Sequence, residues 1–228
     1  MARTVKRPYD NSRRLAQARA TRLEVIEAAK RLFIERGYPG TTLEAVAGAA
    51  GVALPTLYRL FGSKRALLQA ILDTSFGGDD EPIAFEDRPE QQQAMAEPDP
   101  AAIVRAFARI CRLFMERSAE MFHVLSSAAQ VDPEIAELSS EIRRQRHAGQ
   151  SRIVAAIAAR NALDPELSIA DAEDITYAAL SPEVHRILTI ERGWTSDQYE
   201  RWLTRALNSL IQPQPDRHRQ PAQRSGNR

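Results

Sequence analysis

Apolar residues recur every three to four positions wherever the chain lacks Gly- and Pro-rich breaks. Residues 15–36 show this helical spacing, and Gly37 follows as a residue that commonly ends helices. The apolar positions of this first stretch are Val25, Ala28, Ala29, Leu32 and Phe33. No segment alternates between apolar and polar residues over the length of a strand. The pattern therefore predicts an all-α fold.

Polar residues mark where further helices begin. Thr41 and Glu44 have the spacing of a capping box, so a short helix is predicted to begin there and to end near Gly51. Ser63 can cap the next apolar run. Later starts are marked by a capping side chain followed by proline, at residues 99–100, 132–133, 164–165 and 181–182.

The last predicted helix carries the strongest local signal. Thr195 and Gln198 form a capping box, and Trp194 and Tyr199 occupy the two positions of a hydrophobic staple. The apolar stripe that follows consists of Tyr199, Trp202, Leu203, Ala206, Leu207 and Leu210.

The segment around Gly51 has the features of a helix-turn-helix. Gly51 can adopt a positive φ in a tight turn, and Ala47 stands four residues before it. The residues expected between the two helices are Val46, Ala50, Val52 and Leu57. The second helix is predicted from Leu54 to Leu60 and is short enough to lie in the major groove of DNA. Small helical hairpins are common, so periodicity alone leaves a structural role open.

Charge is distributed unevenly along the 228 residues, although the net charge is only +1. Residues 1–75 hold thirteen Lys and Arg against six Asp and Glu, a balance of +7. The other 153 residues hold eighteen basic and twenty-four acidic side chains, a balance of −6. A basic N-terminal module favours a polyanion such as nucleic acid, with a merely solvated basic surface as the alternative.

Composition divides the chain into four parts. We predict a DNA-binding domain with a basic arm over residues 1–75, a linker over 76–97, a regulatory and dimerisation domain over 98–211, and a disordered tail over 212–228. No apolar run approaches the roughly 20 residues that span a membrane. The basic N-terminus lacks the apolar stretch of a secretory signal, so we expect a cytoplasmic protein.

Several motifs together resemble the DNA-binding domain of the tetracycline-repressor (TetR) family. They are Gly37-Tyr38, Thr41-Thr42-Leu43-Glu44-Ala45-Val46-Ala47, and the run from Ala50-Gly51-Val52 to Ser63-Lys64-Arg65-Ala66-Leu67-Leu68. The resemblance is dense over residues 21–72. It is weaker beyond residue 98, where residues 181–186 and 191–194 resemble the C-terminal domain of one branch of the family.

The resemblance implies a homodimeric repressor or activator that a small-molecule effector releases from a double-stranded, pseudo-palindromic operator. It places Thr42 and Lys64 on phosphates and the first turn of the recognition helix on bases. The DNA-binding residues expected on this basis and from the outward face of that helix are Thr42, Leu54, Pro55, Thr56, Tyr58, Arg59 and Lys64. Two residues depart from the family pattern: Ala53 replaces a frequent capping serine, and Leu60 replaces a frequent polar or aromatic residue.

Two further sites are expected in the C-terminal part. Five residues in its middle are predicted to cluster, either as core or as the lining of a ligand pocket: Phe107, Cys111, Phe114, Met121 and Phe122. Dimer contacts are predicted from helices around 169–192 and 195–211, with the side chains Tyr199, Trp202, Leu203 and Leu207.

Other chemistry has little support in the sequence. Glu120 and His123 have the spacing of di-iron ligands, but no second copy of that motif exists, so no metal site is expected. No catalytic motif or cofactor loop appears, and neither catalysis nor a cofactor is predicted. The lone cysteine, Cys111, excludes an internal disulfide. The basic arm that contains Arg3, Lys6, Arg7, Arg13 and Arg14 could reach DNA or serve only as a solubilising tail.

The competing interpretations are a helical enzyme or ligand carrier with an incidental basic N-terminus, and an adaptor that grips another protein.

Overall fold

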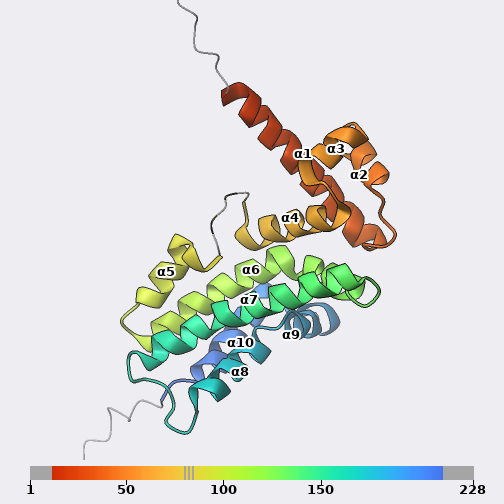
Figure 1. The fold of residues 1–228 in the computed structure, drawn as a ribbon. Coiled ribbons are helices and arrows are strands. Elements are labelled where there is room, and N and C mark those ends of the chain that lie inside the picture. The colour runs from red at the N-terminus through yellow and green to blue at the C-terminus, as the bar shows by residue number, and fades with distance from the viewer. Residues whose placement is uncertain (1–11, 80, 82, 84, 213–228) are drawn as a thin grey trace, which may run out of the picture. The chain divides into compact units, whose positions relative to one another are not determined.

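The computed structural model describes residues 12–79, 81, 83 and 85–212. Within these residues it contains helices, turns and one isolated bridge between Leu163 and Ile211, so the predicted all-α class is confirmed (Figure 1). Arg3, Lys6 and Arg7 of the basic arm and residues 213–228 of the predicted tail lie outside the described residues. The helices are α1 (Ser12–Arg36), α2 (Leu43–Ala49), α3 (Leu54–Phe61), α4 (Lys64–Gly77), η1 (Phe85–Asp87), α5 (Pro89–Ala96), α6 (Pro100–Ala128), α7 (Pro133–Ala158), α8 (Ile169–Ala179), α9 (Pro182–Arg186), the π-helical turn η2 (Ile187–Glu191) and α10 (Ser196–Asn208).

Most predicted helix starts are confirmed by their hydrogen bonds. The side chains of Ser63 and Ser181 cap α4 and α9, and Thr195 forms the predicted capping box with Gln198 at α10. The pair at residues 164–165 does not start a helix, because the Asp164 carboxylate accepts from Glu166 N in a turn and α8 begins only after Ser168.

The predicted cap of α2 was wrong by one residue. Thr42 is the N-cap, and its side chain accepts from Ala45 N at 3.2 Å. Thr41 is fully buried, and its hydroxyl donates to the carbonyl oxygens of Leu32 and Gly37, at 3.0 and 2.9 Å. Thr41 therefore joins the start of α2 to the end of α1 instead of capping a helix.

The chain divides into two compact units, and α6 and α7 contribute to both. The first unit comprises Met1–Arg88 and Leu113–Arg146, and the second comprises Pro89–Arg112 and His147–Arg228. These units follow the packing of the chain, whereas the four-part division by composition stays a prediction.

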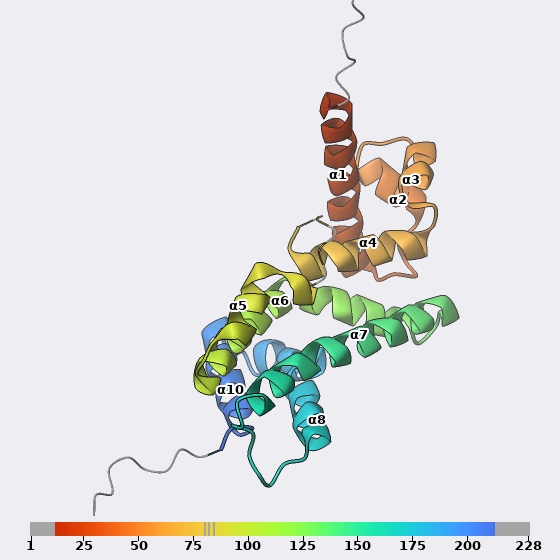
Figure 2. The same ribbon diagram turned by 60° about the vertical axis from the view of Figure 1, so that its left-hand side comes forward.

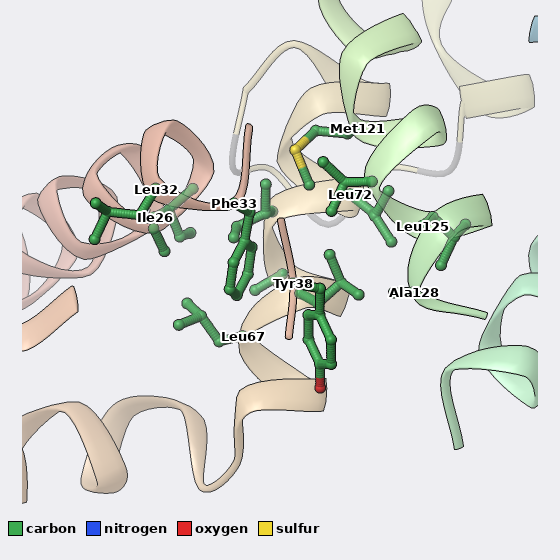
Figure 3. Packing of buried hydrophobic residues seen from close by; sticks show 14 of the residues in the cluster. Ile26, Leu32, Phe33, Tyr38, Leu67, Leu72, Met121, Leu125 and Ala128 are labelled. Carbon is green, nitrogen blue, oxygen red and sulfur yellow. The ribbon is translucent and has the colours of Figure 1, made fainter. Parts of the chain in front are cut away.

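The first unit has one hydrophobic core that joins α1 and α4 to the second half of α6. Leu72 of α4 lies beside Met121 and Leu125 of α6, in the cluster that also holds Phe33 and Tyr38 (Figure 3). Leu72 and Met121 are completely buried. The hydrophobic core of the helix-turn-helix segment is thus completed by residues that follow it by about fifty positions in the sequence.

Two arginines hold the C-terminal end of α4 in this unit. The Arg88 guanidinium forms a two-point ion pair with Asp79, with both N···O distances at 2.8 Å, and Arg88 is only 7% exposed. Arg117 of α6 donates to the Phe76 carbonyl at 3.5 Å. A Cβ at Gly77 would lie 2.5 Å from the Arg88 Nη2 atom, so glycine provides the space for this guanidinium.

The second unit contains the residues that we predicted as dimer contacts, and this prediction was wrong for three of them. Tyr199, Leu203 and Leu207 are completely buried against Ile103, Val104, Ile153, Val154 and Ile157 of the same chain. Trp202 is half-buried and packs on the same core. The apolar stripe of α10 is therefore part of the core of the second unit, where the first half of α6 and the second half of α7 cover it.

The five predicted pocket residues do not form one cluster. Phe107 and Cys111 lie in the core of the second unit, whereas Phe114, Met121 and Phe122 lie in that of the first. Phe114 and Phe122 pack with Phe76 and Phe85, with ring centroids 4.8 to 6.0 Å apart. All five residues are buried core side chains, and a ligand-binding role for any of them stays a prediction.

Candidate nucleic-acid interface

The turn between α2 and α3 has the geometry that the sequence predicted. Gly51 has a φ of +66°, a left-handed conformation that favours glycine. Val52 N donates to Ala47 O at 3.0 Å and ties the turn to α2. Val46 and Leu57 are completely buried between the helices. The two helices are therefore held at a fixed angle by their own core, and the outer face of α3 is left for other contacts (Figure 2).

The outer face of α3 consists mainly of Pro55, Tyr58 and Arg59, which are exposed. Tyr58 keeps 48% of its surface although it is a large aromatic residue. Thr56 is half-buried, and Leu54 is half-buried against the core. Pro55, Leu57, Tyr58 and Arg59 thus have the burial that the periodicity predicted, whereas Leu54 and Thr56 lie closer to the core than expected.

Backbone atoms take over the capping of α3. Ala53 offers no side-chain cap, as its residue type requires, and its carbonyl accepts from Thr56 N at 2.8 Å. Leu60, the second departure from the family pattern, is half-buried and packs against the core of the first unit. Both departures are consistent with a stable α3.

Thr42 lies exposed at the start of α2. Its hydroxyl oxygen accepts the capping bond from Ala45 N, which leaves the hydroxyl proton able to donate outward. A phosphate oxygen is a suitable acceptor for such a proton.

Lys64 begins α4 and rests on an aromatic ring. Its Nζ atom lies 4.3 Å from the centroid of the Tyr38 ring, and burial lowers the pKa of Lys64 while nearby Asp132 raises it. Burial chiefly raises the pKa of Tyr38 to about 12, with Asp132 and Glu134 adding to the effect. Arg65 Nε donates to the Glu134 carbonyl oxygen at 3.5 Å. The Lys64 ammonium has three donors on a flexible four-carbon stem, so it can also reach a phosphate near the Tyr38 ring.

Sequence reasoning missed two features near this surface. The Arg22 guanidinium carbon lies 4.7 Å from the centroid of the Phe61 ring and so joins α1 to the last residue of α3. The ring of Tyr38 supports Lys64. The Gly-Tyr pair was part of the motif, but the contact between Tyr38 and Lys64 depends on how α1 and α4 pack.

Comparison with known proteins identifies this domain. Residues 25–71 match the family model described as bacterial regulatory proteins, tetR family. The transcriptional regulator TtgR of Pseudomonas putida is 45% identical over 58 residues, which are 25% of this chain and 28% of TtgR. The transcriptional repressor ComR of Escherichia coli is 26% identical over 131 residues, 56% of this chain and 58% of ComR. The match to the tetR family model is thus confined to the N-terminal domain, and the similarity spans less than a third of the length of TtgR.

Solved structures extend the likeness to the whole fold. NalD of Pseudomonas aeruginosa, described as the secondary repressor of a multidrug efflux pump, covers 86% of this chain and 98% of its own, with a TM-score of 0.62 and 20% identity. The SmeT–triclosan complex has a TM-score of 0.67 at 16% identity, and covers 86% of this chain and 93% of SmeT. At these identities the likeness concerns the fold. Among the described residues, no helix is both long and apolar enough to cross a bilayer.

Proposed function

We propose that the protein is a DNA-binding transcriptional regulator whose α3 enters the major groove. One observation carries this proposal: a TetR-type helix-turn-helix presents Pro55, Tyr58 and Arg59 to solvent while Leu57 anchors the helix from behind. The surplus of basic residues over residues 1–75 supports a polyanionic partner. We assign the protein no catalytic residue, and a regulator of chromosomal genes acts in the cytoplasm.

Each predicted DNA-binding residue has a role in this proposal. Thr42 and Lys64 donate to phosphates and fix the register of the domain. Pro55 and Thr56 approach base edges, together with the exposed part of Leu54, and their apolar groups suit thymine methyls. Tyr58 and Arg59 extend from the same helix to bases or the adjoining backbone.

The test is binding selection from a random duplex library, followed by titration of the selected duplex. The variant Tyr58→Ala should lose about 1–3 kcal/mol of binding free energy, roughly 5- to 150-fold in affinity. The melting temperature should stay near that of the parent, because Tyr58 is half exposed. Val131→Ala, which shortens a side chain that is 70% exposed in the turn after α6, serves as the control and should bind normally. Equal affinity of Tyr58→Ala and the parent would refute the assignment of α3.

We further propose a homodimer whose contacts come from α8 and η2. Both elements pack on α10, and their exposed apolar side chains are Ile169, Ile175, Ile187 and Ile190. Ile190 is 73% exposed to solvent. Exposed apolar side chains that cluster on a surface commonly mark an interaction site. A two-fold axis would present two copies of α3 about 34 Å apart, matching one turn of DNA.

The dimer proposal has a test with an internal contrast. Ile190→Glu combined with Ile175→Glu should yield a folded monomer in sedimentation velocity, because both side chains lie on the surface. Leu203→Glu should instead unfold the second unit, because Leu203 is completely buried. A dimer that survives the double isoleucine substitution would move the interface elsewhere.

We propose that the protein is a repressor and that a small molecule, by binding its C-terminal part, releases it from the operator. The description of SmeT as a triclosan complex and of NalD as a repressor supports this proposal. Release requires different ligand affinities in the DNA-bound and free conformations, with a coupling of about 1–3 kcal/mol. Triclosan and other apolar aromatic compounds, titrated into the complex with the selected duplex, should include at least one that lowers DNA affinity. If every compound that raises the melting temperature leaves DNA affinity unchanged, release by ligand is wrong.

A further inference from the structure

The turn between α6 and α7 packs against the beginning of α4. In the first unit, Ala128 at the end of α6 and Ile135 in the first turn of α7 share one buried core with Tyr38 (Figure 3). Arg65 of α4 donates from Nε to the Glu134 carbonyl oxygen at 3.5 Å, across 69 positions of the sequence. The turn therefore lies close to the part of α4 that we propose to contact a phosphate.

Two groups act on the ammonium of Lys64 at this place. The Lys64 Nζ atom lies 4.3 Å from the centroid of the Tyr38 ring. Burial lowers the pKa of Lys64, and the negative charge of Asp132 opposes this by raising it. The same carboxylate contributes, after burial, to the raised pKa of Tyr38. Asp132 is therefore near enough to attract the Lys64 ammonium.

The carboxylate of Asp132 is held in place because it caps α7. Its Oδ1 atom accepts from the backbone N of Glu134 at 3.0 Å and of Ile135 at 3.3 Å. Pro133 is the first residue of α7 and has no N–H to offer. A cap needs an acceptor oxygen and no negative charge, since asparagine and serine cap helices as well as aspartate does. The charge of Asp132 is thus separable from its structural role.

This charge opposes the contact that Lys64 is proposed to make. Lys64 and Arg65 bring two positive charges to the start of α4, and Asp132 and Glu134 bring two negative charges to the turn that packs on it. A phosphate that approaches Lys64 meets an ammonium already attracted by a carboxylate, and is itself repelled by that carboxylate.

We propose that Asp132 weakens operator binding by competing with a DNA phosphate for the Lys64 ammonium, so that the turn between α6 and α7 sets the affinity of the helix-turn-helix. This inference rests on the proposed function, in which Lys64 contacts a phosphate. Phosphates are the same at every base pair, so Asp132 changes affinity and leaves sequence preference as it is.

The test removes the charge and keeps the cap. Asp132→Asn and Asp132→Ser both retain a capping oxygen, so their melting temperatures should stay near that of the parent. Both variants should bind the selected duplex about 2- to 5-fold more tightly than the parent, the effect of one exposed charge pair. In a Lys64→Gln background, titrated at low salt, this gain should disappear because the ammonium for which Asp132 competes is gone.

Asp99 provides a matched control in the second unit. Its carboxylate oxygens accept from Ala101 N and Ala102 N, both at 3.2 Å, so it caps α6 as Asp132 caps α7, and a proline follows it as well. Asp99→Asn removes the same charge from the same kind of cap and should leave DNA affinity unchanged.

The outcomes separate this inference from the proposed function. Unchanged or weaker DNA binding by both Asp132 variants overturns the inference while the proposed function stands. An equal gain from Asp99→Asn, or a gain that persists in the Lys64→Gln background, also overturns it, because the charge would then act without Lys64. If the parent chain selects no duplex at all, the proposed function fails and this inference fails with it.

Discussion

Gly77 should be a position where alanine, despite its better helix propensity, destabilises the protein. An added Cβ would lie 2.5 Å from Arg88 Nη2 and 3.3 Å from its guanidinium carbon. The end of a long side chain normally moves aside at little cost. Here Arg88 is 7% exposed and held by Asp79 at two points, both at 2.8 Å. The methyl group therefore forces apart a packed ion pair at the end of α4.

The balance of two terms gives the expected magnitude. Alanine gains at most about 1 kcal/mol over glycine in a helix, and less at its last residue. Forcing a methyl group into a closely packed site costs about 1–3 kcal/mol. Gly77→Ala should therefore lose about 1–2 kcal/mol, which corresponds to about 2–8 °C in melting temperature for a chain of this size.

Gly149 provides the matched control. It lies inside α7, and a Cβ built there would meet no atom within 4 Å. Gly149→Ala should raise the melting temperature, measured by circular dichroism, by about 1–4 °C. In an Arg88→Ala background Gly77→Ala should no longer destabilise the protein, because the obstructing guanidinium is gone and only the small gain in helix propensity remains. If Gly77→Ala raised the melting temperature as Gly149→Ala does, the close packing of Arg88 on Gly77 would be wrong.

Three other expectations concern the same unit. The pKa of Asp79 is lowered from 3.8 to about 2, first by hydrogen bonds from Arg88. The ion pair of Asp79 with Arg88 therefore stabilises the protein above about pH 4, and this stabilisation is lost as the pH falls toward 2. The urea midpoints of the parent and of Asp79→Asn should converge over that interval. Thr41→Val should cost about 1–3 kcal/mol in urea unfolding, because the buried hydroxyl that donates to the Leu32 and Gly37 carbonyl oxygens is lost. Thr42→Ala should cost about 1 kcal/mol as a lost cap, and the opposite order of the two costs would contradict the reassigned cap. A fragment of residues 1–88 should lack cooperative melting, because α6 completes its core; a sharp transition would refute that dependence.

Local signals in the sequence were sufficient for the helix-turn-helix. Gly51, the buried Val46 and Leu57, and the exposed Tyr58 all follow from spacings of a few residues. The caps at Ser63 and Thr195 were predictable for the same reason, since a capping side chain reaches only to the third residue after it. The burial of most α3 residues could therefore be predicted, whereas their contact with DNA stays a prediction.

The same reasoning gave the wrong cap where two residues of one type are adjacent. Thr41 and Thr42 both place a hydroxyl before α2, and the Glu44 spacing favoured Thr41. The end of α1 packs over Thr41 and offers it two carbonyl oxygens, so Thr42 is left to cap the helix. The contact of Lys64 with Tyr38 was equally hidden, because it joins residues on different elements.

The sequence by itself determined which segments are helical, where most of them begin, which face of each is apolar, and where positive charge concentrates. Each of these properties depends on residues within one or two turns of one another. Only the tertiary structure decided what each apolar face covers. The stripe of Tyr199, Leu203 and Leu207 would suit a partner chain as well as the chain's own core, and the packing of α6 and α7 assigned it to the core while leaving Ile190 outside. An apolar stripe encodes the need for burial but not the surface that provides it, because the hydrophobic effect has no direction.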